Sequence, residues 1–359
     1  MSGYELRGYT DRRTGAGARR VRGPRVRNLA MLSAVLLSGG LSTGCGSSDD
    51  PPAAVRALNV VIPTTSIEAE HGIWAAQDRG YFKAEGVAVK VTSVSGGAQA
   101  VQSLAAGSAE LIDAPTTSVI GSVAKQPSFK PTYVCRTYWA PPLNVYVPAD
   151  STVQAGADLK GATIGVDDPD GPAAAAAVAL AKSAGLTPTD YKILQVGNGG
   201  QALAAFQRKD ITAYAGGVGD MAVAQAKGFQ VRQIQGARGG VTAGQGFWAS
   251  AKALSSKSDA ITRFLRAYQK GVNYIGTDAG KLAALTKKLA PDQATDNNVT
   301  MRVSQAFITM RTHDLPATMA SCATTPDDLT TWHDQLNKSG AYSGSQTDFN
   351  GYFTDEFAK

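Results

Sequence analysis

The chain has 359 residues, of which 43% are hydrophobic, and a formal net charge of +6. Residues 1–44 hold eight arginines against two acidic residues, so the rest of the chain carries 27 basic and 27 acidic residues. The positive excess belongs to this first segment, and it gives no argument for nucleic-acid binding. The remaining length is enough for two lobes with separate hydrophobic cores.

The N-terminal segment has the order of a secretory signal. An arginine-rich region precedes an apolar run at 29–37, and small residues lead to Cys45. The apolar run is too short to span a bilayer as an ordinary helix, so residues 1–44 are predicted to be a signal peptide. Residues 45–56 are small, acidic and proline-rich, which predicts a flexible tether.

The cysteine at the end of the signal resembles a bacterial lipobox cysteine, although Ser42 instead of leucine stands three residues before it. The resemblance implies that Cys45 is lipidated and anchors the protein to the outer face of the cell membrane. Secretion without lipidation stays the alternative, and the sequence leaves both the general and the twin-arginine export routes open.

The stretch from Asn59 to Pro115 predicts strand, helix, strand, helix and strand. Apolar residues crowd at 60–62, alternate from 87 to 91, and crowd again at 111–112, while the intervening segments have helical signals. We expect the first helix to open with a capping box from Thr65 to Glu68 and to stop at Gly80. Strands that are joined by helical crossovers must lie parallel, so the chain begins as an α/β sheet.

The pattern restarts after a β-rich run at 143–147. Strands are predicted at 132–136, 162–166, 191–196, 211–215 and 231–234, and helices at 118–125, 172–184, 201–208, 219–227, 259–276, 279–288, 297–310 and 326–339. Residues 198–202 echo 95–100, each before a strand, so the second half repeats the first. The runs at 141–148 and 244–248 are predicted to cross between the lobes as a two-strand hinge.

The run from His71 to Val91, then Gly96-Gly97 and Gly107 to Ala114, resembles the periplasmic solute-binding proteins of ABC importers. It is most similar to the group that takes up alkanesulfonates, taurine, nitrate and thiamine pyrimidine precursors. The resemblance implies an α/β, two-lobed type II periplasmic-binding-protein fold in which each lobe is a mostly parallel sheet flanked by helices. Lobe 1 would hold 57–145 and 249–359, and lobe 2 would hold 146–248.

The same resemblance implies a monomer that captures a small organic molecule between its lobes and delivers it to an ABC permease in the membrane. A ligand sensor that presents its closed form to a membrane signalling protein stays the alternative, because both roles need the same closing cleft.

Ligands of open α/β sheets sit outside the carboxyl ends of the parallel strands, near helix N-termini. The predicted ligand-binding residues are Thr65, Ser66, Gly96, Gly97, Thr116, Thr117, Trp139, Asp168, Asp170, Asn198 and Trp248. The two tryptophans flank the crossovers, where a flat ligand would stack on them. Capping of their own helices stays the alternative for the polar members.

The sequence alone leaves the charge of the ligand undecided. Asp167, Asp168 and Asp170 would repel an anion if they face the cleft, which favours a neutral or cationic nitrogen heterocycle over a sulfonate. Acidic residues also favour a helix N-terminus through its dipole, without touching a ligand.

An enzyme is disfavoured. The yeast thiamine-pyrimidine synthases share this fold and use a histidine in the first helix and a cysteine-rich iron motif. Here Glu70 stands where that histidine would fall, His71 follows it, and the cysteine-rich motif is absent. The three histidines are scattered along the chain, so no metal or cofactor is expected.

Two cysteines follow Cys45. An even pair outside the cytoplasm can form a disulfide, so Cys135 and Cys322 are predicted to be bonded. Two separate buried thiols are the alternative.

Overall fold

The computed structural model describes residues 56–126, 128–138, 143–169, 172–234 and 244–312, together with residues 334, 352 and 354. Several predictions made above lie outside these residues: the signal peptide, most of the tether, Cys45, Trp139, Asp170, Cys322 and almost all of the helix at 326–339.

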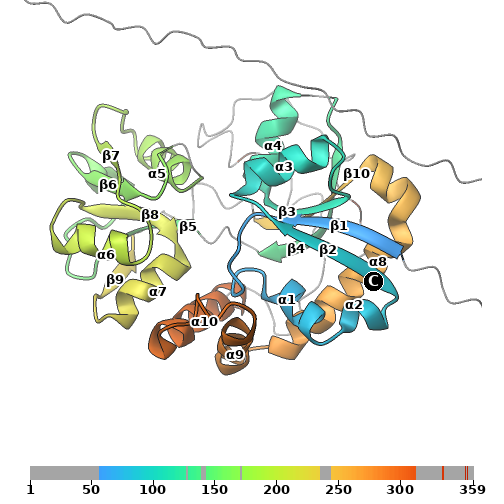
Figure 1. Ribbon diagram of the computed structural model, residues 1–359. Coiled ribbons are helices and arrows are strands. Elements are labelled where there is room, and N and C mark those ends of the chain that lie inside the picture. Colours follow the sequence, from blue (N-terminus) through green and yellow to red (C-terminus); the bar gives the residue numbers. More distant parts are fainter. Residues whose placement is uncertain are drawn as a thin grey trace, which may run out of the picture. The chain divides into compact units, whose positions relative to one another are not determined.

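The first sheet is built from strands that precede and follow the second sheet in the sequence. Its elements are β1 (Arg56–Ile62), α1 (His71–Asp78), α2 (Tyr81–Ala84), β2 (Val87–Ser93), α3 (Gly97–Ala105), β3 (Leu111–Pro115), α4 (Thr116–Lys125), β4 (Pro131–Tyr138) and β10 (Gln245–Ser250). The strand order is β2-β1-β3-β10-β4. Strand β1 is parallel to β2 and β3, whereas β10 runs antiparallel to β3 and β4 (Figure 1). The sheet is therefore mixed, with β10 as its single reversed strand.

The second sheet repeats this plan. Its elements are β5 (Leu143–Pro148), a short 3₁₀ helix (Gly156–Leu159), β6 (Thr163–Val166), α5 (Pro172–Ser183), β7 (Lys192–Gln195), α6 (Gly200–Gln207), β8 (Ala213–Gly217), α7 (Val218–Ala226) and β9 (Val231–Gln233). The order is β7-β6-β8-β5-β9, with β5 as the reversed strand. The internal echo in the sequence thus corresponds to two sheets of the same topology.

Three helices follow β10: α8 (Ala251–Ile275), α9 (Ala279–Leu289) and α10 (Asn297–Thr312). The hydroxyl of Ser250 caps α8 and the carboxylate of Asp278 caps α9. Helix α8 is kinked at Lys257, where φ is −135°. Helix α10 contacts α7, the helix that follows β8 of the second sheet. Asn298 of α10 donates a hydrogen bond to the carbonyl oxygen of Ala226 in α7 at 3.0 Å.

Alternation along the strands gives the first sheet a core on each face. One core joins Leu58, Val60 and Ile62 of β1 to helices α1, α2 and α8. The other joins Val61 to helices α3 and α4. Because successive strand residues point to opposite faces, the neighbours in β10 divide in the same way between the two cores.

Three sequence predictions need adjustment. The first helix begins at His71, and the cap of the preceding turn is Ser66, whose hydroxyl accepts the N–H of Ala69 at 3.1 Å; the capping box from Thr65 was wrong. Strand β5 pairs along its whole length in the second sheet, and β10 pairs along its whole length in the first. The chain therefore passes from one sheet to the other between β4 and β5 and again between β9 and β10. The lobe boundaries predicted at 145 and 248 lie inside β5 and β10.

The sulfur of Cys135 is buried in β4 and takes part in a disulfide bond. Cys322, its predicted partner, lies outside the described residues, so this pairing stays a prediction. In the part of the chain that the structure describes, none of the helices is long and apolar enough to cross a membrane.

Candidate functional site

The loop after β1 holds the first two predicted ligand residues. Thr65 is exposed, and its carbonyl oxygen accepts a hydrogen bond from the side chain of Gln293 at 3.2 Å. The hydroxyl of Ser66 is engaged locally, with Ala69 as donor and Glu68 as acceptor. Both residues lie at the carboxyl end of a parallel strand, as predicted, but the Ser66 hydroxyl acts as a cap.

The glycine pair before α3 brings three loops together. Gly96 has a φ of +88°, which favours glycine, and its N–H donates to the carbonyl oxygen of Pro63 at 2.9 Å. A Cβ on Gly97 would lie 2.6 Å from Oγ of Ser118 in α4. The pair therefore holds the ends of β1 and β3 close to each other.

Thr116 and Thr117 open α4. Thr116 is fully buried, and its hydroxyl has no hydrogen-bond partner in the structure. Its N–H donates to the carbonyl oxygen of Gly244 at 3.1 Å, beside the start of β10. A buried hydroxyl without a partner is costly, so the position of this one beside the carboxyl ends of the strands needs an explanation.

In the second sheet, Asp168 and Asn198 are exposed. A third polar residue at this edge, Asp220 in α7, has a carboxylate that accepts several hydrogen bonds. It accepts the N–H groups of Gly199 and Gly217, each at 3.0 Å, and the hydroxyl of Tyr214 at 3.2 Å. Asp220 thus joins two loops at the carboxyl edge of this sheet, and burial raises its pKa.

Trp248 does not line an open surface. Its side chain is 1% exposed and packs edge-on against Tyr133, with ring centroids 4.8 Å apart. It belongs to the core between the first sheet and helices α3 and α4. The sequence interpretation placed it at a crossover, but β10 continues through Trp248 as a central strand, which points the indole into the core.

A group of polar side chains meets at the carboxyl edge of the first sheet. We call Glu70, Asp113, Thr137 and Gln245 the carboxyl cluster. Asp113 accepts a hydrogen bond from the hydroxyl of Thr137 at 3.1 Å and another from the amide of Gln245 at 3.0 Å. Its carboxyl group also hydrogen-bonds that of Glu70. All four residues are at most 5% exposed.

The pKa values of both carboxyl groups of the cluster are raised. Burial raises the pKa of Asp113 to about 6, and the hydrogen bonds from Gln245 and Thr137 limit that rise. Burial and the neighbouring Asp113 raise the pKa of Glu70 well above its ordinary value. A hydrogen bond between two carboxyl groups needs a proton, so near neutral pH the pair shares one proton and bears one negative charge.

Arg311 of α10 lies nearby without a contact ion pair to either carboxyl group among the described residues. Its guanidinium donates to the hydroxyl of Tyr268 at 3.1 Å and lies 6.0 Å from the ring centre of Tyr138. The hydroxyl of Tyr138 donates in turn to the carbonyl oxygen of Ala69. Arg311 thus offsets part of the negative charge from a distance.

His71 has a structural role. Its Nδ1 lies 2.8 Å from the carbonyl oxygen of Glu68, which can only accept, so Nδ1 carries the proton. Burial, followed by the positive charge of Arg311, lowers the pKa of His71 to about 3. The ring is neutral at ordinary pH and fixes the turn that presents Glu70. Among the described residues, no three His, Cys, Asp or Glu side chains are grouped as a metal site.

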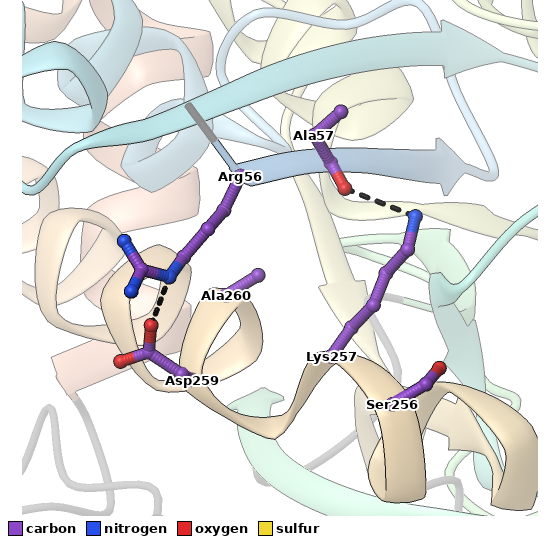
Figure 2. A pocket seen from close by; sticks show the side chains of 6 residues that line it. All are labelled: Arg56, Ala57, Ser256, Lys257, Asp259 and Ala260. Carbon is purple, nitrogen blue, oxygen red and sulfur yellow. Dashed lines mark hydrogen bonds and ion pairs between the residues drawn. The ribbon is translucent and has the colours of Figure 1, made fainter. Parts of the chain in front are cut away.

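Among the described residues, two cavities beside elements of the first sheet contain no residue of the carboxyl cluster. The larger, about 620 Å³, is lined by Thr65, Trp74, Asp78 and Gln293 among others. The smaller, about 170 Å³, lies at the start of β1. Figure 2 shows its ion pair between Arg56 and Asp259 and the hydrogen bond from Lys257 to the carbonyl oxygen of Ala57, 3.0 Å long. These contacts hold the kinked part of α8 against β1. Their donors and acceptors all belong to this chain.

Comparison with known proteins shows the family and the fold of the chain. A family described as "NMT1/THI5 like" matches residues 69–278. The fold is similar to the periplasmic aliphatic sulphonate binding protein SsuA from Escherichia coli, with 16% identity and a TM-score of 0.64 over 85% of this chain and 99% of that one. No curated protein sequence matches the chain.

Two further structures agree on the fold. The alkanesulfonate-binding protein SsuA from Xanthomonas axonopodis, bound to MOPS, has 17% identity and a TM-score of 0.56, covering 79% of this chain and 93% of that one. The ligand binding component of an ABC-type import system from Staphylococcus aureus, with zinc bound, has 9% identity and a TM-score of 0.58, covering 83% and 96%. At these identities the likeness establishes the type II periplasmic-binding-protein fold.

Proposed function

Because this chain belongs to the NMT1/THI5-like family, we propose that it is an extracytoplasmic solute-binding protein that delivers a small organic molecule to an ABC importer. The proteins of similar fold are named as sulfonate-binding proteins and as the binding component of an import system. The substrate class of those relatives does not pass to this chain through the fold alone, so the ligand must be argued from its own residues.

One observation carries this proposal: the carboxyl edge of the first sheet holds a buried polar cluster that its own side chains leave incomplete. Oε1 of Glu70 and Oγ of Thr116 have no hydrogen-bond partner in the structure. Strands β3, β4 and β10 and the turn before α1 all bring polar groups to this edge. Open α/β sheets bind their ligands at this edge.

The second sheet supplies the other half of the proposed site through Asp168, Asn198 and the loops that Asp220 joins. Ligand contact with both sheets stabilises a closed form, since the ligand shifts the equilibrium by its difference in affinity for the two forms. The chain passes between the sheets twice, before β5 and before β10, and these two passages are the proposed hinge.

The direct test is native mass spectrometry of the gently purified mature protein. We expect one small molecule to be retained in a one-to-one complex and lost on denaturation. Once identified, that molecule at about 100 times its dissociation constant should add roughly 2.7 kcal/mol to the free energy of unfolding. A chain that retains no molecule and is not stabilised by any solute of a transport-substrate panel is not a solute-binding protein.

We further propose that Cys45 is lipidated and holds the protein on the outer face of the membrane, where it meets its permease. Each buried methylene of an acyl chain contributes about 0.8 kcal/mol, so more than one chain gives firm anchoring. In the variant Cys45→Ser, the protein should move from the membrane fraction to the medium or periplasm. A variant that stays membrane-bound and is processed at the same bond would show that Cys45 is not the anchor.

A further inference from the structure

We propose that the cavity of about 620 Å³ between α1 and the end of α9 is a second binding site, for an uncharged amphipathic molecule that carries hydroxyl or carbonyl groups on an apolar body. No residue of the carboxyl cluster lines this cavity. Of the predicted ligand residues that the structure describes, only Thr65 does. The cavity is therefore a different site from the one proposed between the sheets, and the inference does not rest on the proposed function.

Two contacts within the chain hold the walls of this cavity together. Asp78, the last residue of α1, forms an ion pair with Lys288 of α9, with 2.5 Å between Oδ1 and Nζ. The side chain of Gln293 donates a hydrogen bond to the carbonyl oxygen of Thr65 at 3.2 Å. These contacts join α9 and the segment after it to α1 and to the loop after β1. The cavity is thus formed without a ligand, and its volume lies in the range of about 300–1,000 Å³ that is usual for small-molecule sites.

One part of the cavity wall is apolar. Ile67 and Ala290 belong to a small core that α1 and α9 share, and Trp74 packs against that core. Leu289 also lines the cavity, and it is 39% exposed although its side chain is apolar. An apolar ligand body would remove this leucine from water, which is favourable. The wall therefore fits the apolar half of an amphipathic molecule.

The indole of Trp74 provides a second, independent observation. Its Nε1 is buried and has no hydrogen-bond partner in the structure. A buried donor without an acceptor is costly, so each one calls for an explanation. The indole N–H of Trp248 is also without a partner, but that ring lies in a packed core, whereas Trp74 lines a cavity. A hydroxyl or carbonyl oxygen of a ligand in the cavity would accept the N–H of Trp74.

The charges around the cavity favour an uncharged ligand. Among the described residues that line it, Asp78 is the only charged one, and its carboxylate already has Lys288 as a partner. An anionic ligand would lie near Asp78 without a cation among the lining side chains to offset its charge. An ammonium group would have to compete with Lys288 for the same carboxylate. The side chains of Gln77 and Ser93, which also line the cavity, can both donate and accept hydrogen bonds, so they suit hydroxyl and carbonyl groups.

The experiment is an NMR titration of the full mature chain with cyclohexanol and with cyclohexanecarboxylate, which share a ring and differ in charge. The indole N–H signal of Trp74 is identified by its loss in Trp74→Phe. We expect cyclohexanol to shift this signal saturably, and the carboxylate to bind about tenfold more weakly or not at all, because its charge is not offset. In Trp74→Phe, the affinity for cyclohexanol, followed at the backbone amide of Gln77, should fall about three- to tenfold, since one neutral hydrogen bond is lost.

Leu289→Trp tests whether the cavity itself is the site. Because Leu289 is exposed, the variant should fold, and its larger side chain would occupy space in the cavity. Cyclohexanol should then no longer shift the Trp74 signal. Met301→Trp is the matched control, because Met301 is an apolar residue of similar exposure, 44%, that does not line the cavity. It should leave the titration unchanged.

The absence of a saturable shift of the Trp74 signal with cyclohexanol would overturn the inference. Equal affinity for the carboxylate, or wild-type binding in Leu289→Trp, would do the same. Shifts at the amide of Thr116 in place of Trp74 would put the probe at the proposed ligand site between the sheets, which also contradicts the inference. None of these results changes which molecule the native mass spectrum retains, so the proposed function is tested separately.

Discussion

Replacing Trp248 with alanine is expected to lower the free energy of unfolding by about 3–5 kcal/mol, the usual cost of removing a large aromatic side chain from a core. The indole is 1% exposed and packs edge-on on Tyr133. The variant leaves a cavity between the first sheet and helices α3 and α4, which the surrounding helices can fill only in part. Urea denaturation at fixed pH measures the change.

Trp248→Phe separates core packing from ligand stacking. The indole N–H makes no hydrogen bond in the structure, so phenylalanine keeps most of the packing and leaves no partner unsatisfied. We expect it to cost clearly less than the alanine variant and to leave ligand affinity unchanged. An alanine variant with wild-type stability and weakened ligand binding would return Trp248 to the ligand site.

Replacing Gly271 with alanine is expected to cost about 2–3 kcal/mol or more. Helices α1 and α8 approach so closely that a Cβ on Gly271 would lie 2.1 Å from the carbonyl oxygen of Gly72 and 2.8 Å from the backbone nitrogen of Ala76. Both clashes are with backbone, so relief requires the two helices to separate. That separation would also disturb the contacts of Tyr268, which lies on α8 beside Gly72.

Gly121→Ala in α4 is the matched control. A Cβ at Gly121 meets nothing within 4 Å. Since alanine is a better helix former than glycine, the free energy of unfolding of this variant should rise by about 0.5–1 kcal/mol. Thermal or urea denaturation measures it. Equal effects of the two alanines would mean that the contact between α1 and α8 is not the reason for glycine at position 271.

Local patterns were sufficient to predict most of the fold. Alternation and capping signals placed the described strands and most of the described helices within a few residues, and the glycine at position 80 ends its helix segment with a φ of +71° as expected. The exception is α8, which was predicted to begin at 259 and begins eight residues earlier, at Ala251. Patterns of this kind act over neighbouring residues, and they specify the element and its apolar face. The repeated segments at 95–100 and 198–202 also anticipated that the two sheets share one topology.

The carboxyl cluster was not predicted because it depends on tertiary structure. Its members come from positions 70, 113, 137 and 245, and only the sheet order brings them together. A signal existed: Asp113 stands inside the apolar run Leu111 to Ala114, and an acid in a buried strand marks either a paired charge or a functional group. The burial of Trp248 was missed for the converse reason. An apolar run in the sequence does not indicate which face of the sheet its aromatic residues occupy.

We propose that a solute binds between the two sheets and closes them. Small-angle X-ray scattering of the mature chain, first stripped of the co-purified molecule and then saturated with it, tests this most directly. We expect a smaller radius of gyration in the loaded form, because ligand contacts with both sheets favour closure. Identical scattering from the stripped and saturated protein would contradict it.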